Sequence, residues 1–307
     1  MNRLVAIVGP TGVGKSRLAG YLAGVFNGEI ISADSRQVYR HLDIGTDKPL
    51  PQELSRVPHH LINIIDPNQD FGLAQYQAMA CDAIEDIQRR RKLPFFTGGS
   101  GLYIWAVLEG WRIPRVSPDP ELRYNLEKRA SDAGIDELYQ ELVKIDPQAA
   151  QKIDYRNVRR VVRALEVNIK TKTPFSQLRH KEAPAFNFYI IGLTADRAEL
   201  YRRVDQRVDA MFKRGFVTEV ENLLKMGYDL NLPAMSGIGY RQIGKFLKGE
   251  LSLDLAKQQI KSETHRLVRH QYAWFRLTDR RIHWFDVQRQ QYLEMREALA
   301  DFMRNNT

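Results

Sequence analysis

Residues 7–16, with the sequence IVGPTGVGKS, constrain the fold of this 307-residue chain more than any other segment. The spacing of their glycines, lysine and serine matches the phosphate-binding pattern G-x-x-x-x-G-K-[ST]. The apolar run before them, LVAIV, reads as a buried strand, and residues 15–26 after them read as a helix. Such a loop holds phosphate oxygens with backbone N–H groups and the helix N-terminus, so it belongs between a strand and a helix.

The side chains of this loop have separate expected tasks. Lys15 adds a positive charge beside a bound phosphate, and the hydroxyl of Ser16 can hold Mg²⁺. The residues expected to bind phosphate are Gly9, Pro10, Thr11, Gly12, Val13, Gly14, Lys15 and Ser16. The loop by itself does not indicate which reaction uses that phosphate.

Strand and helix signals alternate after the loop. Further strands are expected within residues 29–34, 59–66, 93–99, 188–193 and 281–286, and a long helix over residues 73–91. This alternation predicts an α/β fold, a P-loop NTPase-like parallel sheet flanked by helices. Ligands of such sheets gather at the carboxyl ends of the strands. The phosphate loop, Asp34 and the Gly98-Gly99 pair all follow expected strands, so we expect them to share one crevice.

The pattern changes near Trp111, where the segment RIPRVSPDPEL is rich in proline and charge. From residue 118 to residue 178 the signals are helical only, and a linker follows. We therefore expect an all-helical insertion domain, residues 113–187. It would interrupt a catalytic core made of residues 1–112 and 188–307, with helices at its C-terminal end.

The net charge of +9 favours a polyanionic partner, although a merely basic surface would also produce it. No apolar run reaches the roughly 18–20 residues that a bilayer span needs, so no membrane association is expected. The single cysteine, Cys81, excludes an internal disulfide and suits a reducing compartment. The first residues lead straight into the phosphate loop and leave no room for a signal peptide. We expect a cytoplasmic protein.

Asp34 follows the second expected strand in ISADSRQVYR and has several possible roles. A carboxylate there could hold a metal, accept a proton or orient a nucleophile. It could equally cap the next helix. Nearby, Arg36 could meet a phosphate and Gln37 could read a base edge. A kinase acting on a small alcohol also predicts an acid here, so phosphoryl transfer remains an alternative.

Two basic rows support a nucleic-acid partner, although a single row is usually a solvated face. The first row flanks the apolar helical face of VRRVVRALEV, and the second repeats every four residues in a later helix. The rows consist of Arg156, Arg159, Arg160 and Arg163, and of Lys257, Lys261, His265 and Arg269. The pair His59-His60 lacks a Cys/His cluster, and adjacent residues of a strand face opposite ways, so we expect a structural role rather than a metal site.

Further motifs follow in order: HLDIGTDKP, VPHHLINIIDP, TGGSGLYIWAVLEG, RVVRALEV, GIGYRQI and WFR. With them the chain resembles the tRNA dimethylallyltransferases, also called tRNA isopentenyltransferases, over nearly its whole length. The resemblance implies transfer of a prenyl group from dimethylallyl diphosphate to the exocyclic N6 amine of the adenine just 3′ of certain anticodons. Diphosphate would leave, with Mg²⁺ as cofactor, and the loop would hold the leaving group. The partners would be dimethylallyl diphosphate and the anticodon stem-loop of tRNA, and the enzyme would be a monomer.

The resemblance also implies site residues. Asp34 would accept the proton of the amine, Thr11 would lie near the reacting atoms and Arg207 would bind the diphosphate. Arg207 also lies between Val204 and Met211 on one helical row, so packing of its stem is an alternative. The residues expected to contact tRNA are Asp34, Ser35, Arg36, Gln37, Ser100, Arg123, Arg159, Arg160, Val161, Val162 and Arg163.

Some positions depart from the family pattern. Ser100 replaces the more usual threonine but keeps the hydroxyl, and Lys172 stands where glycine is typical of a local turn. His265 and His270 replace arginine or lysine, which predicts that tRNA affinity depends on pH. Three alternatives remain: prenylation of free adenine nucleotides, a small-molecule kinase, and a non-catalytic RNA-binding ATPase. The basic helical insertion disfavours the first, because a free nucleotide does not need it.

Overall fold

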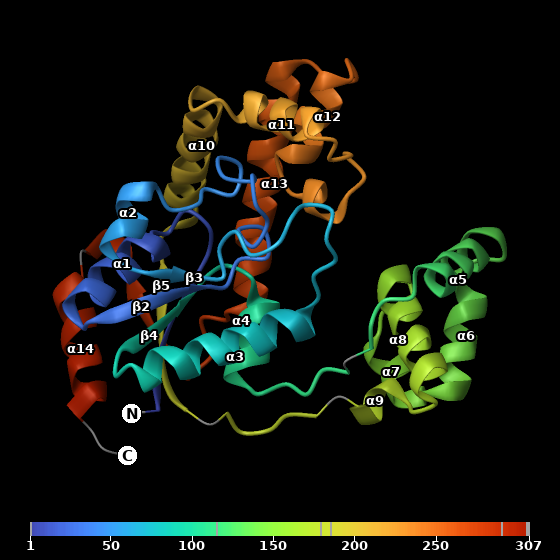
Figure 1. The fold of residues 1–307 in the computed structure, drawn as a ribbon, viewed down its shortest axis with the longest axis horizontal. Helices are drawn as coiled ribbons and strands as arrows, with labels where there is room; N and C mark the ends of the chain where they lie inside the picture. Colours follow the sequence, from blue (N-terminus) through green and yellow to red (C-terminus); the bar gives the residue numbers. More distant parts are fainter. Residues whose placement is uncertain (1, 115, 179, 185, 290, 305–307) are drawn as a thin grey trace. The chain divides into compact units, whose positions relative to one another are not determined.

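The computed structural model describes residues 2–114, 116–178, 180–184, 186–289 and 291–304. The chain forms two compact units (Figure 1). The first contains Met1–Leu108 and Pro184–Thr307, and the second contains Glu109–Ala183. From the sequence, the insertion was expected to run from residue 113 to residue 187. Among the described residues, no helix has both the length and the hydropathy needed to cross a bilayer.

The first unit contains a sheet of six strands in the order β3-β2-β4-β1-β5-β6. Every pair of neighbouring strands is parallel. The α/β prediction, a P-loop NTPase-like parallel sheet flanked by helices, is therefore confirmed. The strands are β1 (Arg3–Val8), β2 (Gly28–Ser32), β3 (His59–His60), β4 (Leu93–Thr97), β5 (Asn187–Thr194) and β6 (Ile282–Asp286).

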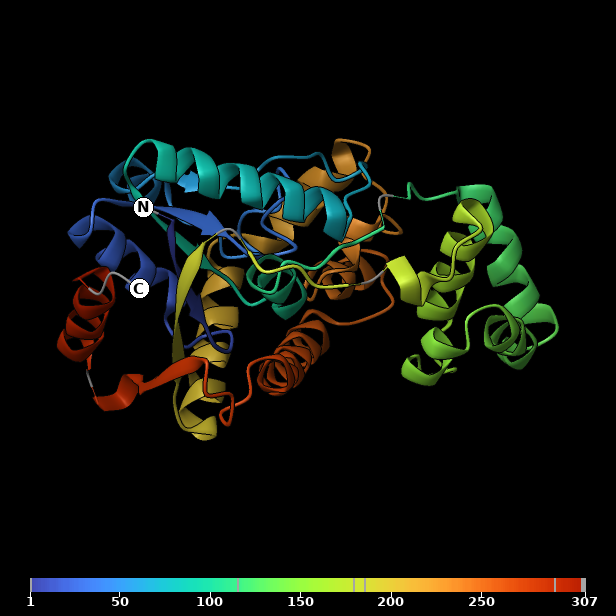
Figure 2. The ribbon, with the colours of Figure 1, turned by 90° about the horizontal axis from the view of Figure 1, so that it is seen from below.

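Helices cover both faces of the sheet because the central strands bury side chains on both sides. On one face, Val5 and Ile7 of β1 share a hydrophobic cluster with α1 (Lys15–Val25) and α14 (Tyr292–Arg304). On the other, α3 (Leu73–Arg89) packs against β2 and β4. Figure 2 shows α3, drawn in teal, apart from α1 and α14, drawn in blue and red. The phosphate loop thus starts from a strand that is buried along its whole length.

The third strand is shorter than the sequence pattern indicated. A strand was expected over residues 59–66, but β3 contains only His59–His60. The backbone turns away at Leu61 (φ 62°) and Asn63 (φ 58°), which adopt a left-handed conformation that no regular strand contains. The expectation was wrong beyond residue 60 because an apolar run does not reveal such turns.

The remaining helices of this unit extend beyond the sheet, with two short 3₁₀ turns, η1 (Pro233–Ser236) and η2 (Val287–Arg289). The helices are α2 (Pro51–Arg56), α4 (Gly101–Leu108), α10 (Arg197–Lys213), α11 (Phe216–Lys225), α12 (Tyr240–Leu247) and α13 (Leu253–Trp274).

The second basic row lies on α13 and faces α10 rather than an open surface. Lys257 and Lys261 each lie 2.9 Å from the carboxylate of Asp209. His265 pairs with Asp205 at 2.9 Å, and Arg269 donates a hydrogen bond to the hydroxyl of Tyr201. This matching of charges between two helices counts against a nucleic-acid contact of the row, which stays a prediction. The contact of His265 with Asp205 likewise counts against a pH-dependent RNA contact by this histidine.

The second unit consists of the helices α5 (Pro120–Asp132), α6 (Ile135–Ile145), α7 (Pro147–Lys152), α8 (Val158–Thr171) and α9 (Phe175–Leu178). Leu126, Leu138, Leu142 and Leu165 belong to its separate core. The carboxylate of Glu166, fully buried, accepts hydrogen bonds from the guanidinium groups of Arg123 and Arg163. This unit therefore has its own hydrophobic core and its own buried ion pair.

Lys172 ends α8 in the left-handed conformation, with φ 53° and ψ 24°. Glycine is favoured at such a helix end because a Cβ atom strains this backbone. The departure from the family pattern at this position therefore keeps the turn and accepts the strain.

Candidate active site

The phosphate loop joins β1 to α1 in a conformation that needs glycine. Gly9, Gly12 and Gly14 have φ values of 140°, 83° and 100°. A Cβ atom on Gly9 would collide with the carbonyl oxygen of Leu193 in β5. Gly14 directly precedes α1, so the loop ends at the positive end of that helix. The local structure is that of an anion-binding loop.

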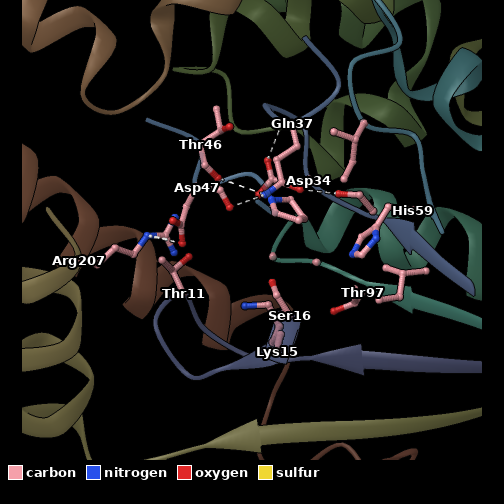
Figure 3. A pocket seen from close by; sticks show the side chains of 16 residues that line it. Thr11, Lys15, Ser16, Asp34, Gln37, Thr46, Asp47, His59, Thr97 and Arg207 are labelled. Carbon is pink, nitrogen blue, oxygen red and sulfur yellow. Dashed lines mark hydrogen bonds and ion pairs between the residues drawn. The ribbon is translucent and has the colours of Figure 1, made fainter. Parts of the chain in front are cut away.

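A pocket lies at the carboxyl ends of the strands (Figure 3). Thr11, Lys15 and Ser16 reach it from the loop, and Asp34 and Gln37 reach it from the segment after β2. Its other lining residues are Ile30, Ser32, Thr46, Asp47, Pro49, His59, Ile62, Thr97, Gly98, Gly99 and Arg207. The expectation that the loop, Asp34 and the Gly98-Gly99 pair share one crevice is confirmed.

Lys15 has an unusual electrostatic environment. Its ammonium group donates a hydrogen bond of 2.8 Å to the carbonyl oxygen of Pro10. Burial, and after it the charge of Arg207, lower the pKa of Lys15 from 10.5 to about 7, while Asp34 acts in the opposite direction. An anion bound in the pocket stabilises the charged form again.

This environment predicts that binding of inorganic pyrophosphate takes up a proton at Lys15 above pH 7. Below its pKa of about 7, Lys15 is already charged in the free pocket. As the pH rises above that value, affinity falls by up to about tenfold per pH unit, because the bound state retains a proton that the free state has lost. Calorimetry at pH 8 in two buffers of different ionisation enthalpy measures the uptake. In the Lys15→Gln variant, only the proton exchange of pyrophosphate itself should remain. Equal proton uptake by the variant and the wild type would contradict the prediction.

Asp34 stabilises a turn and also faces the pocket. Its Oδ1 accepts hydrogen bonds from the backbone N–H groups of Arg36 (2.8 Å) and Gln37 (3.4 Å). In the described part of the chain, its Oδ2 has no hydrogen-bond partner. Asp34 therefore caps a turn rather than a helix, which was the alternative expected from the sequence. Its second carboxylate oxygen is left for a ligand. Ser100 supports the same turn, since its hydroxyl accepts a hydrogen bond of 3.0 Å from the N–H of Ser35.

The side chains of Arg36 and Gln37 are engaged within the protein. The guanidinium group of Arg36 donates to the carbonyl oxygen of Pro233 (2.6 Å) and to the hydroxyl of Ser236 (3.1 Å). The amide of Gln37 accepts from Ser32 Oγ at 2.9 Å and donates to the carbonyl oxygens of Thr46 and Asp47. These contacts count against the expected phosphate contact of Arg36 and base contact of Gln37.

Three residues of the site were missed by the sequence patterns. Asp47 Oδ2 lies 3.4 Å from Nε of Arg207. Gln271 of α13 accepts a hydrogen bond of 2.8 Å from the N–H of Thr11 and donates one of 3.1 Å to the carbonyl oxygen of Gly99. It therefore ties the phosphate loop to the segment after β4. Asp47 lies inside the motif HLDIGTDKP, whereas nothing in the sequence around Gln271 indicates its contact.

The third missed residue is His59. Its Nδ1–H donates a hydrogen bond of 2.7 Å to the carbonyl oxygen of Val57, and its ring lines the pocket. Burial lowers the pKa of His59, which favours the neutral ring. His60 instead lies 2.7 Å from the carboxylate of Glu29. The two histidines thus have different partners, as their alternation along a strand predicts.

Comparison with known proteins gives the family. The model of the IPP transferase family matches residues 37–278. This chain belongs to the IPP transferase family. A second model, for isopentenyl transferases, matches residues 2–64. A tRNA dimethylallyltransferase from Thermomicrobium roseum is 49% identical over 305 residues, which cover 99% of this chain and 92% of that protein. Another, from Roseiflexus castenholzii, is 51% identical over 276 residues and 90% of each chain.

Solved structures of IPP transferases have the same fold. The full-length tRNA isopentenylpyrophosphate transferase of Bacillus halodurans superposes with a TM-score of 0.73 at 38% identity, covering 98% of this chain and 96% of that one. A eukaryotic dimethylallyltransferase acting on tRNA gives a TM-score of 0.83 at 26% identity, covering 100% of this chain and 81% of that one.

In the helical unit of this IPP transferase, the structure counts against RNA contacts by the side chains of four of the expected residues. The side chains of Val161 and Val162 are buried in its core, so they cannot meet RNA. Those of Arg123 and Arg163 are paired with Glu166. Arg159 and Arg160 are exposed, and their side chains have no polar partner among the described residues. Of the arginines expected to bind RNA in this unit, these two have free guanidinium groups.

Proposed function

We propose that this chain transfers a dimethylallyl group from dimethylallyl diphosphate to the N6 amine of the adenine immediately 3′ of the anticodon in tRNA, releasing diphosphate. The observation that carries the proposal is the pocket in which the phosphate loop and Arg207 lie beside the carboxylate of Asp34. Family membership and the tRNA-modifying relatives favour this activity over phosphoryl transfer to a small alcohol.

The cations of the pocket stabilise the leaving group. As the bond between the allylic carbon and oxygen breaks, its electron pair goes to the diphosphate. Lys15 and Arg207 stabilise this developing negative charge. N–H groups of the loop also stabilise it, because they already point at the phosphate site before the reaction starts. The N–H of Thr11 is bound to Gln271 and that of Val13 to the carbonyl oxygen of Pro10, so the remaining N–H groups of the loop are the ones proposed to hold the diphosphate. The loop therefore holds what is released rather than what is transferred.

The carboxylate of Asp34 assists the nucleophile. The adenine amine is a weak nucleophile because its lone pair is delocalised into the ring. As this nitrogen forms the new bond to carbon, it must lose a proton, and a carboxylate within hydrogen-bond distance accepts it. Oδ2 of Asp34 is free for this task, while Oδ1 holds the turn.

The residues of the pocket fit a magnesium ion. Hydroxyl and carboxylate oxygens, from Ser16, Thr11 and Asp34, line the pocket, and Mg²⁺ prefers oxygen ligands together with phosphate. Among the described residues, no group of three or more His, Cys, Asp or Glu side chains forms a metal cage. Ser16 would hold an ion that is bound mainly through the diphosphate. Mg²⁺ supplies additional charge stabilisation to the leaving group.

The helical unit is the proposed grip on the anticodon stem-loop. Its exposed Arg159 and Arg160 can contact phosphates. The target base must leave its stack to reach a pocket, which costs a few kcal/mol and least in a single-stranded loop. An anticodon loop therefore suits this enzyme better than a duplex.

The two exposed arginines lead to a prediction about salt. In plots of the logarithm of tRNA affinity against the logarithm of salt concentration, Arg159→Ala and Arg160→Ala should each make the slope shallower by about one unit, because each removes one phosphate contact. Filter binding or fluorescence anisotropy over a salt series measures the slope. Lys128→Ala, on the exposed surface of α5, is the matched control. Slopes unchanged in both arginine variants would rule out their contact with phosphate.

The function is tested by incubating the protein with Mg²⁺, dimethylallyl diphosphate and tRNA. Mass spectrometry of the digested tRNA should find one five-carbon unit on the adenine next to the anticodon. Parallel reactions contain AMP as acceptor, or ATP with small alcohols. Prenylated AMP with unmodified tRNA would support the free-nucleotide alternative, and a phosphorylated alcohol would overturn prenyl transfer.

A further inference from the structure

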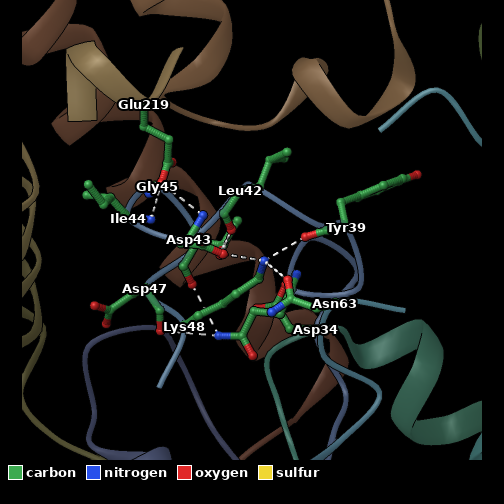
Figure 4. A network of polar contacts seen from close by, with 12 residues as sticks. Asp34, Tyr39, Leu42, Asp43, Ile44, Gly45, Asp47, Lys48, Asn63 and Glu219 are labelled. Atoms are coloured by element: carbon green, nitrogen blue, oxygen red, sulfur yellow. Dashed lines mark hydrogen bonds and ion pairs between the residues drawn. The ribbon is translucent and has the colours of Figure 1, made fainter. Parts of the chain in front are cut away.

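One carboxylate outside the pocket collects four hydrogen bonds. Glu219 of α11 points at the loop that follows residue 42 (Figure 4). Its donors are the backbone N–H groups of Asp43 (2.9 Å), Ile44 (2.6 Å) and Gly45 (3.1 Å), and the hydroxyl of Tyr240 (2.7 Å). Three consecutive N–H groups form a small anion-binding concavity, and Glu219 occupies it.

The GIGYRQI motif explains how Glu219 is held. Gly239, at φ 97°, leaves room for the ring of Phe216, which a Cβ atom would meet at 2.5 Å. Tyr240 follows at the start of α12 and is almost fully buried. Burial and the nearby Glu219 raise the pKa of Tyr240, so its hydroxyl stays a hydrogen-bond donor. The motif thus places a neutral donor against Glu219.

Lys48 fixes the other end of the same loop. Its ammonium group donates to the carbonyl oxygen of Tyr39 (2.6 Å), to Asp43 Oδ1 (2.7 Å) and to Asn63 Oδ1 (2.5 Å). Only 7% of Lys48 is exposed, so these contacts are shielded from water. The Asp43–Lys48 loop, residues 43–48, is therefore clamped at both ends.

This clamped loop carries Asp47 into the pocket. Asp47 Oδ2 lies 3.4 Å from Nε of Arg207, and Oδ1 lies 3.4 Å from Arg214. Among the described residues, the guanidinium group of Arg207 makes this ion pair with Asp47 but no side-chain hydrogen bond. Asp47 therefore keeps the arginine at the pocket, where its N–H groups can still donate to an anion. Arg207 and Lys15 repel each other across the pocket, so the position of Arg207 depends on this contact with Asp47.

We propose that Glu219 is a positioning residue for the diphosphate, acting through the Asp43–Lys48 loop and Asp47 on Arg207. This inference rests on the proposed function. Without the carboxylate of Glu219, three N–H groups lose their acceptor and the loop relaxes. Asp47 then no longer holds Arg207, which the charge of Lys15 repels from the pocket. Asp34 lies on a turn that has hydrogen bonds of its own to Arg36 and Ser100, and the side chain of Gln37 joins this turn to the carbonyl oxygens of Thr46 and Asp47. We therefore expect the acceptor side of the reaction to change less than the diphosphate side.

The test compares the two substrates in Glu219→Gln. We expect the Kd of Mg²⁺-pyrophosphate and the KM of dimethylallyl diphosphate to rise about tenfold. A rise of this size corresponds to weakening the charge-assisted hydrogen bonds that Glu219 accepts. The KM of tRNA should stay within about twofold. Glu221→Gln, on the same helix, is the matched control and should behave as the wild type. Asp47→Asn should raise the same two constants. The double variant Glu219→Gln/Asp47→Asn should have a Kd no higher than that of the single variant that binds pyrophosphate more weakly, because both changes act through one path.

Several outcomes overturn the inference. One is a lowered Tm of Glu219→Gln with an unchanged pyrophosphate Kd and unchanged KM values. Another is an equal rise in the KM of dimethylallyl diphosphate and the KM of tRNA. Tighter pyrophosphate binding by Asp47→Asn would make Asp47 a competing anion instead. If Glu219→Gln does not fold, Tyr240→Phe removes one donor and should raise the pyrophosphate Kd about two- to threefold, and no rise contradicts the proposal. A wild type that neither binds pyrophosphate nor prenylates tRNA would refute the proposed function itself.

Discussion

The Asp34→Asn variant is expected to transfer the prenyl group about a hundred to ten thousand times more slowly than the wild type, the usual contribution of a general base. Asparagine retains an oxygen that can accept the hydrogen bond from the N–H of Arg36, which is 2.8 Å long in the wild type. The turn should therefore persist in the variant. It cannot accept the proton of the amine. Binding of pyrophosphate should stay within about twofold, since the loop keeps its geometry and Asp34 has the smallest of the three effects on Lys15. Single-turnover measurements at saturating tRNA report the chemical step.

The control for this prediction is Asp82→Asn, which removes a carboxylate from the exposed side of α3 and should leave the rate unchanged. A full rate in Asp34→Asn would end the assignment of a proton acceptor. A slow variant that also binds pyrophosphate tenfold more weakly would make Asp34 a part of the diphosphate site.

The Glu166→Ala variant is expected to destabilise the helical unit by about 3–5 kcal/mol, the usual effect of removing one partner of a buried ion pair. It leaves Arg123 and Arg163 without the carboxylate that joins α5 to α8, and the N–H of Asp119 without its acceptor at 2.7 Å. Hydrogen exchange should rise throughout residues 116–178, because these helices share one core. Denaturant unfolding monitored within this unit measures the loss.

Arg159→Ala serves as the control, because its side chain is exposed and should change stability by less than about 0.5 kcal/mol. Arg123→Ala should resemble Glu166→Ala in direction. Weakened tRNA binding by Arg123→Ala would then follow from the loss of structure. If Arg123→Ala kept full stability and lost only RNA affinity, the contact inferred from the family resemblance would be restored.

Local patterns predicted much of this fold. The alternation of strands and helices gave a parallel sheet, and the phosphate loop and Asp34 were expected at the same crevice. These features depend on short-range information: side-chain periodicity, glycine spacing and the position of a residue just after a strand. The prediction fails where the backbone turns within an apolar run, as at Leu61, because the side-chain pattern does not reveal the turn.

Contacts between distant segments could not be predicted in the same way. A spacing of four residues indicated that Lys257, Lys261 and His265 share one helical face, but not that Asp205 and Asp209 lie opposite. Those two acids are also four residues apart, so comparing charged rows between helices could have found the pairing. Gln271 meets Thr11 across 260 positions of sequence, and a lone glutamine carries no pattern.

The helical unit occupies one continuous stretch of chain inside a discontinuous partner. It joins that partner at two crossings and keeps its own core. Inherited changes on its surface can therefore accumulate without disturbing strand pairing or the glycine-rich turn. Under the proposed division of roles, the contact with tRNA and the bond-breaking step can therefore change independently during evolution.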